Sequence, residues 1–210
     1  MVGDQVEGYS IYQWWVIVYT IFSAFCDHQF LLTKRGITDK LQRVFWPFLR
    51  TFTRSILLER TLILIKPDAI QRGLMGEIAS RFEAKGLKIA GCKMMQLDNA
   101  ILDAHYVHLT DKPFYPRLQE FMSATPVIAM CLEGFEAVDA VRELCGVTNS
   151  RKAAPGTIRG DLGMSMQCNL VHASDSTESA VDEVARFFQP NELYSYSGAL
   201  DTVVYADDER

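Results

Sequence analysis

From residue 60 onward, apolar and polar positions follow regular patterns. The run "RTLILIK" is apolar almost throughout and stops before Pro67, which lacks the N–H that a central strand needs, so it predicts a buried strand closing at Lys66. Apolar residues then recur at helical spacing through "GEIASRFEAKG", which predicts a helix. Gly86 is suited to the position just after a helix, where the backbone is left-handed. The next segment, "LKIAGCKMMQL", predicts a second strand.

The middle of the chain continues this alternation. "DNAILDAHYVHL" predicts a helix capped by Asp98, and "YPRLQEFM" predicts a short helix with Pro116 in its first turn. "PVIAMCLEG" predicts another buried strand. Residues 135–145 carry apolar side chains on one face and precede Gly146, which predicts a further helix that ends there.

The carboxyl-terminal third begins with a segment of little periodicity, residues 149–168, and loops of this length in compact domains are usually functional. "CNLVHA" predicts a brief strand, and Asp175 with Glu178 predicts a capping box before the helix in "STESAVDEVARFF". Helices thus alternate with strands, without a repeat of fixed period. We expect an α+β fold, a ferredoxin-like α/β sandwich with a four-stranded antiparallel sheet.

Residues 1–58 precede this regular part, and we expect them to form a helical extension. The stretch from Gly8 to Cys26 carries no charge and approaches the ~20 residues that cross a bilayer. Basic residues dominate positions 34–54, and positions 41–52 place apolar residues on one helical face. Membrane association through residues 9–54 and an overrun of the gene model explain this pattern equally well. The following domain is expected in the cytoplasm in both cases, tethered to the membrane in the first.

Charge and cysteine content narrow the choice of partners. The 210-residue chain has a formal net charge of −5 and a pI near 5.4, which gives no general attraction to a polyphosphate backbone, so no nucleic-acid partner is expected. Its five cysteines are scattered without metal-ligand spacing. They are typical of reduced core residues.

The sequence lacks the glycine-rich motifs that cradle phosphate, both GxxxxGK[ST] and GxGxxG. A phosphate group would therefore be held by side chains, for which arginine offers a planar set of donors and lysine a mobile charge. The candidates are Lys66, Arg142, Thr148, Arg159 and Asn169. Taken singly, each is more often a solvated surface group, and His172 is more often a satisfied core histidine than a catalyst.

Four motifs favour a functional interpretation of these residues. The segments "IKPDAIQRGLMGEI", "HYVHLTDKPFYPRL", "GVTN" with "APGTIRGD", and "NLVHASDSTESA" follow one another in an order and at spacings that resemble the nucleoside diphosphate kinase family. The resemblance covers about residues 59–205. It assigns residues 59–210 to one kinase domain and does not extend to residues 1–58.

The resemblance implies a ping-pong transfer of the γ-phosphoryl group of ATP or another nucleoside triphosphate to a nucleoside diphosphate, through a phosphohistidine on His172. It implies that Glu183 and Ser174 orient the histidine ring and that Tyr106 lies beside it. Phe114 would stack on the base of the nucleotide, and any base offers it a π-face. The implied contacts to ribose and phosphate are Lys66, Arg142, Thr148, Arg159 and Asn169.

The same resemblance implies Mg²⁺ as cofactor, carried by the nucleotide phosphates without a protein ligand. It also implies a homo-oligomer, a hexamer or a tetramer. Two positions depart from the family pattern: Ala173 replaces a usual glycine, which would be strained if that site needs a positive φ, and Met166 faces Phe114 where a small aliphatic residue is common. The competing hypothesis is a non-catalytic scaffold or binding protein with the same fold. The complete polar set favours the enzyme.

Overall fold

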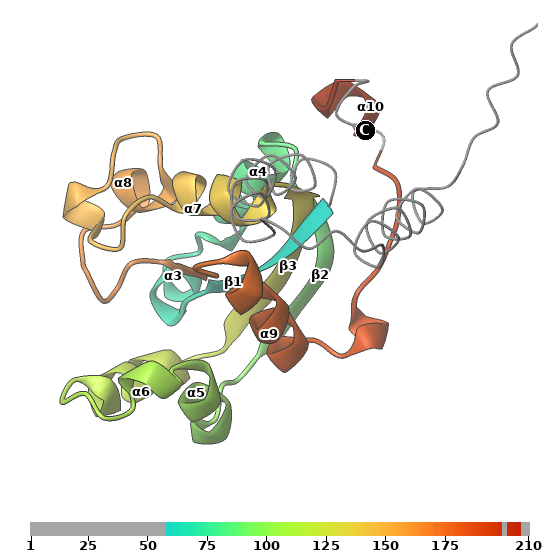
Figure 1. The fold of residues 1–210 in the computed structure, drawn as a ribbon. Coiled ribbons are helices and arrows are strands. Elements are labelled where there is room, and N and C mark those ends of the chain that lie inside the picture. The colour runs from blue at the N-terminus through green and yellow to red at the C-terminus, as the bar shows by residue number, and fades with distance from the viewer. Residues whose placement is uncertain (1–57, 199–200, 207–210) are drawn as a thin grey trace, which may run out of the picture. The chain divides into compact units, whose positions relative to one another are not determined.

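The computed structural model describes residues 58–198 and 201–206 (Figure 1). The predicted helical extension, with its membrane association through residues 9–54, lies outside these ranges. Within them, every helix is too short or too polar to cross a membrane.

Four strands form one sheet in the order β2-β3-β1-β4, and each neighbouring pair is antiparallel. The strands are β1 (Leu58–Ile65), β2 (Lys88–Met95), β3 (Val127–Phe135) and β4 (Val171–Ala173). Because β1 and β2 are both antiparallel to β3, they run in the same direction with β3 between them, and β3 and β4 flank β1 in the same way. These two interleaved βαβ units confirm the predicted ferredoxin-like sandwich.

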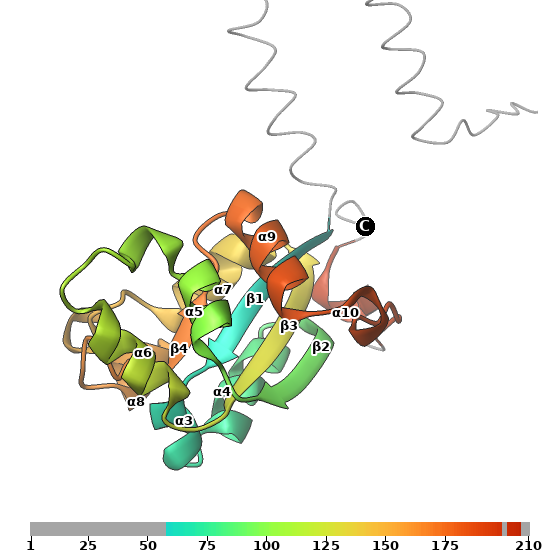
Figure 2. The same cartoon turned by 90° about the horizontal axis from the view of Figure 1, so that it is seen from below.

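Helices cover both faces of the sheet. The α-helices are α3 (Pro67–Gln71), α4 (Met75–Ala84), α5 (Asn99–His105), α6 (Tyr115–Ser123), α7 (Ala137–Cys145), α8 (Ile158–Leu162), α9 (Thr177–Phe187) and α10 (Asp201–Val204); the short 3-10 helices are η1 (Val107–Leu109), η2 (Ser150–Lys152) and η3 (Pro190–Glu192). In Figure 1, α4, α7 and α8 lie on one side of the sheet and α5, α6 and α9 on the other. Figure 2 looks onto this second layer.

Strand β1 is apolar almost throughout because both of its faces are buried. Ile63 and Ile65 belong to the core beneath α4 and α7, whereas Leu62 and Leu64 belong to the core beneath α5, α6 and α9. The helices contribute Ile78, Phe82 and Val141 to the first core, and Leu102, Met122 and Phe187 to the second. Each such side chain stabilises the fold by about 1.5–3 kcal/mol.

The predicted end of α4 is confirmed. Gly86 has φ +98°, its N–H donates to the carbonyl of Glu83 at 2.9 Å, and the N–H of Leu87 donates to the carbonyl of Phe82 at 3.1 Å. This pair of bonds satisfies carbonyls that the end of a helix leaves free. The α5 cap is confirmed as well, since Asp98 Oδ1 accepts from the N–H of Ile101 at 2.9 Å.

Two local predictions were wrong. The helix predicted through "DNAILDAHYVHL" stops at His105, and residues 107–109 form the separate turn η1. The capping box predicted at Asp175 is absent because Ser176 caps α9 instead, accepting from the N–H of Ser179 at 3.1 Å. The segment 149–168 also contains two short helices, η2 and α8, within its irregular path.

Candidate active site

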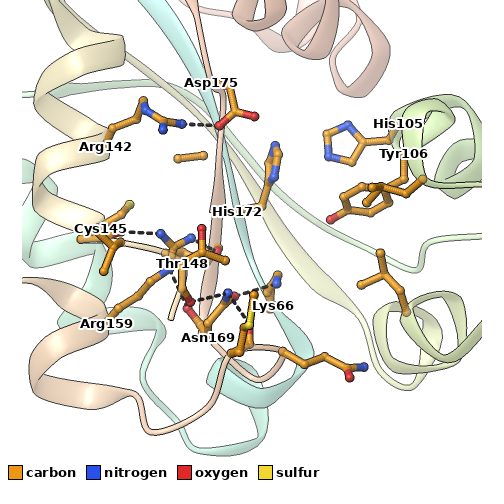
Figure 3. A pocket seen from close by; sticks show the side chains of 18 of the residues that line it. Lys66, His105, Tyr106, Arg142, Cys145, Thr148, Arg159, Asn169, His172 and Asp175 are labelled. Atoms are coloured by element: carbon orange, nitrogen blue, oxygen red, sulfur yellow. Dashed lines mark hydrogen bonds and ion pairs between the residues drawn. The ribbon is translucent and has the colours of Figure 1, made fainter. Parts of the chain in front are cut away.

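A cleft of about 710 Å³ opens beside β4, a volume in the range typical of small-ligand sites (Figure 3). Nine of the ten predicted site residues line it: Lys66, Tyr106, Phe114, Arg142, Thr148, Arg159, Asn169, His172 and Glu183. The tenth, Ser174, is fully buried behind the cleft wall. Residues that lie more than 110 positions apart in the chain are therefore brought together.

His172 is the central residue of β4 and pairs with Leu64 of β1, so the sheet fixes its backbone. Its Nε2 lies 3.1 Å from Oε2 of Glu183, on α9. Ser174 Oγ donates to the same carboxylate oxygen at 2.6 Å and accepts from the N–H of Leu62 at 3.2 Å. The orientation of the Glu183 carboxylate is thereby tied to the core strand of the sheet.

The charge of Glu183 determines which nitrogen of His172 carries the proton. Burial alone would raise the pKa of Glu183, but the hydrogen bond and charge of His172, with the hydrogen bond from Ser174, lower it to about 2. An ionised carboxylate only accepts hydrogen bonds, so Nε2 of a neutral His172 donates. The lone pair of the ring is then on Nδ1.

Lys66 and Asn169 form a buried pair in the floor of the cleft. Lys66 precedes α3, and its Nζ donates to Oδ1 of Asn169 at 2.7 Å. The Asn169 amide nitrogen donates to the carbonyls of Thr148 and Met166 at 3.1 and 2.8 Å, so this side chain also joins two parts of the long loop. Burial lowers the pKa of Lys66 to about 8, with Asp68 opposing and Arg159 adding to the shift.

Arg159, in α8, serves the loop and the cleft together. Its guanidinium donates to the carbonyls of Gly146, Val171 and Asn169 at 2.6, 2.7 and 3.2 Å. Burial lowers the pKa of Arg159, yet a guanidinium keeps its charge in proteins. Among the described residues, three of its five N–H groups have partners, so two remain for an anion in the cleft.

Arg142 reaches the cleft from α7, on the exposed side of that helix. Its Nη1 pairs with Oδ1 of Asp175, just beyond β4 (Figure 3). The side chains are 45% and 79% exposed, respectively, so solvent screens the pair and an incoming anion can compete for the guanidinium. Asp175 was assigned to a helix cap from the sequence, and the structure places it in the wall of the cleft.

The mouth of the cleft is apolar. Phe114 precedes α6 and is 54% exposed, and Met166 in the long loop is 61% exposed. Both line the cleft, so together they offer a flat, adaptable surface to a planar ligand. Tyr106 lies deeper; it is buried, and its ring centroid is 6.2 Å from that of His172.

The backbone next to His172 contains an unusual turn that the sequence did not signal. Leu170 has φ +74°, and the N–H of Val171 donates to the carbonyl of Asn169 at 2.9 Å across it. A leucine in this conformation is strained, and such residues cluster at functional sites. Ala173, in contrast, is an ordinary β4 residue without a positive φ. The backbone strain that a positive φ would cause at this position is therefore absent.

His105 is a further cleft residue that sequence analysis missed. It is the first residue of the motif "HYVHLTDKPFYPRL", immediately before Tyr106. The sequence gave no sign of its burial, because a histidine at the end of a helix is usually a surface group. Its ring centroid is 4.5 Å from that of His172.

An α+β sandwich whose cleft gathers histidine, lysine and arginine side chains, in a sequence without a glycine-rich phosphate loop, is of a class suited to bind phosphate through side chains. Comparison with known proteins identifies the family. The sequence model for nucleoside diphosphate kinase matches residues 59–193. The chain therefore belongs to the nucleoside diphosphate kinase family.

Individual relatives support this assignment over the same region. The chain is 53% identical to the nucleoside diphosphate kinase of Parabacteroides distasonis, an alignment that covers 72% of this chain and 99% of the relative. It is 52% identical to that of Pyrococcus horikoshii, over 68% and 93% of the two chains. A solved halophilic nucleoside diphosphate kinase from Halobacterium salinarum, in complex with CDP, has a TM-score of 0.69 at 43% identity, covering 70% of this chain and 99% of that one.

These matches confirm the enzyme class predicted from the sequence, a nucleoside diphosphate kinase, and with it a nucleotide-binding transferase. The boundary between residues 1–58 and 59–210 stays a prediction.

Proposed function

We propose that the enzyme transfers the γ-phosphoryl group of a nucleoside triphosphate to a nucleoside diphosphate by a ping-pong mechanism, with a phosphohistidine at Nδ1 of His172. The observation that carries this proposal is the hydrogen bond between Nε2 of His172 and Glu183, 3.1 Å long. It supports Nδ1 as the atom with a free lone pair, in a cleft that also contains Lys66, Arg142 and Arg159.

In the first half-reaction, Nδ1 attacks the γ-phosphorus, the bond to the bridging oxygen breaks, and the electron pair leaves with the diphosphate. The attacking nitrogen has no proton to lose, and Glu183 stabilises the positive charge that the ring acquires. In the second half, a β-phosphate oxygen of the acceptor attacks the same phosphorus and the electron pair returns to Nδ1. One cleft therefore serves both nucleotides in turn.

The cationic side chains support the charge balance of this transfer. Lys66 and the two free N–H groups of Arg159 lie on the floor and wall of the cleft, and Arg142 becomes available when phosphate displaces Asp175. Phe114 and Met166 would hold the base without reading its identity, as the tolerance for any base requires. Tyr106 would close the cleft beside the histidine ring.

Mg²⁺ is proposed to enter as part of the nucleotide substrate. The carboxylates that line the cleft, Asp175 and Glu183, are bound to Arg142 and to His172 with Ser174, so they are poorly placed to serve as oxygen ligands. The donor set thus fits a magnesium ion coordinated by phosphate oxygens and water, without a protein ligand.

Labelled ATP tests the mechanism. The enzyme incubated with [γ-³²P]ATP is expected to acquire one acid-labile, base-stable phosphate per chain, and addition of a nucleoside diphosphate should discharge it. The His172→Ala variant should acquire none while it still binds ADP. A labelled His172→Ala variant, or a wild type that never holds label, would refute the phosphohistidine.

Assembly and location remain proposals. A hexamer or tetramer and a cytoplasmic kinase domain are expected, with membrane tethering only if residues 1–58 are present in the mature protein. The sedimentation coefficient of the native protein measures its assembly, and the intact mass of the chain shows whether residues 1–58 are present. The mass of a chain that starts near Leu57 or Leu58 would exclude the membrane tether.

A further inference from the structure

His105 is a buried histidine that the proposed mechanism does not use. Its side chain is 1% exposed, and its ring is surrounded by aromatic neighbours. The ring centroids of Tyr106 and His172 each lie 4.5 Å away and that of Phe187 lies 5.1 Å away, all in edge-on arrangements. A second imidazole is therefore packed directly against the proposed nucleophile.

The polar contacts of His105 fix its tautomer. Nη1 of Arg186 lies 3.4 Å from Nδ1 of His105, and a guanidinium only donates, so Nδ1 accepts and the proton of the neutral ring is on Nε2. The distance from Nδ1 to Oε1 of Glu183 is 3.8 Å, too long for a hydrogen bond. Nε2 is buried and has no hydrogen-bond partner among the described residues.

The surroundings keep this ring uncharged. Burial, followed by the charge of His172, lowers the pKa of His105 to about 3; Glu183 opposes the shift, and Arg186 and His108 add to it. These groups come from β4, α9 and η1, the elements packed around the ring. A neutral His105 can accept from Arg186 but cannot donate from Nδ1 to Glu183.

Arg186 is a second basic side chain near Glu183, and it can compete with His172 for the Glu183 carboxylate. It follows Glu183 by three residues on α9, a spacing that brings two helical side chains together, and it is exposed enough to turn. If it paired with the Glu183 carboxylate, it would weaken the bond from that carboxylate to His172.

We propose that His105 is a positioning residue for phosphoryl transfer: its Nδ1 holds the Arg186 guanidinium away from Glu183, so that Glu183 remains available to His172. This inference rests on the proposed function. It makes His105 act through Arg186 and Glu183, without contact to the nucleotide.

Two substitutions separate this role from simple packing. His105→Phe keeps a ring of similar shape but removes the acceptor, whereas His105→Asn loses the ring and keeps a carbonyl oxygen close to the position of Nδ1. The readout is the single-turnover rate of His172 phosphorylation between pH 5 and 9. His105→Phe should be about tenfold slower, with the acid limb of its pH profile moved down by up to about one unit, because Arg186 then neutralises Glu183. His105→Asn should keep the wild-type profile and a rate within about threefold.

A packing role predicts the opposite order, with the phenyl variant close to wild type and the asparagine variant slow, and that order would overturn the proposal. The rescue is equally specific: Arg186→Gln in the His105→Phe background removes the competitor and should restore the rate and the pH profile. If the phenyl ring prevents folding, His105→Gln carries the same test, because its amide reaches the Nε2 position and leaves Arg186 without its acceptor.

Asn99→Ala, an exposed change on the same helix α5, is the matched control and should leave rate and profile unchanged. Failure of the proposed function shows itself separately, as a wild type that takes up no phosphate. A labelled wild type with a fast His105→Phe variant refutes the positioning role alone.

Discussion

The ammonium group of Lys66 lies 2.7 Å from the amide oxygen of Asn169, 103 residues later in the chain. Lys66 directly follows β1 and Asn169 lies just before β4. Because β1 and β4 are adjacent strands of the sheet, both residues lie at the floor of the cleft. In the part of the chain that the structure describes, the lysine has no ionised partner within hydrogen-bond distance. The proposed function uses this positive charge to bind the phosphates of the nucleotide.

Nucleotide affinity should depend on the protonation of Lys66. Burial lowers its pKa to about 8, so the side chain is charged below that pH and loses its charge as the pH rises above it. The dissociation constant for ADP, measured by calorimetry, is expected to rise about tenfold between pH 7 and 9.5. Lys66→Met should bind weakly at both pH values. An equally steep pH dependence in that variant would assign the effect to another group.

If His172 carries the phosphoryl group as proposed, Glu183→Gln should slow the transfer, because the amide cannot stabilise the positive charge that the ring acquires. The rate of His172 phosphorylation by ATP is expected to fall about 10- to 100-fold, with little change in the dissociation constant for ADP. Asp182→Asn makes the same chemical change at the neighbouring exposed position of α9 and should be silent. If both variants lose activity equally, the effect belongs to the helix and not to the hydrogen bond at 3.1 Å.

Much of the fold was predictable because each strand and helix has a local signature. β1 and β3 are apolar on both faces, and α4 ends at a glycine with φ +98°, features that can be recognised without knowledge of distant residues. The predicted cap at Asp175 was wrong because a local pattern does not contain contacts with distant residues. Asp175 and Ser176 are both good caps, and in the structure Asp175 pairs with Arg142, which lies 33 residues earlier, while Ser176 caps the helix.

The site residues were predicted from motif resemblance, and the structure adds what spacing cannot give. Which nitrogen of His172 is free follows only from the position of Glu183, and the number of free donors on Arg159 follows only from the three carbonyls around it. His105 was missed because its burial is created by α9 and β4, elements that come much later in the chain.

Acid should destabilise the enzyme through His105. Its pKa falls from 6.5 to about 3 on folding, so the unfolded chain binds more protons in that range and stability is lost as the pH falls below about 6.5. The free energy of unfolding should fall by about 1.4 kcal/mol per pH unit from this group alone. Urea unfolding at pH 7.5, 6 and 5 measures the slope. In His105→Asn, the free energy of unfolding should depend less steeply on pH, by the contribution of one proton. An unchanged slope would contradict the assignment.

Gly146 ends α7 with φ +76°, and a Cβ atom there would meet Oγ1 of Thr157 at 2.5 Å. Gly146→Ala should therefore lower the free energy of unfolding by about 2–5 kcal/mol, from backbone strain and steric overlap together. Gly156→Ala is the matched control, because Gly156 has φ +90° with open space around it and should show only the strain. Similar losses in the two variants, measured by urea unfolding, would mean that Thr157 moves aside without cost.

Asp175→Asn should strengthen nucleotide binding, since it frees Arg142 and removes a negative charge from the wall of a cleft that receives a polyanion. Because the ion pair is exposed, the gain is modest: KM for ATP is expected to fall about two- to fivefold, with kcat nearly unchanged. The advantage should shrink in high salt, which screens exposed charges. Asp182→Asn, with the same loss of charge outside the cleft, controls for net charge. A higher KM in Asp175→Asn would show instead that the carboxylate places the guanidinium where the phosphate needs it.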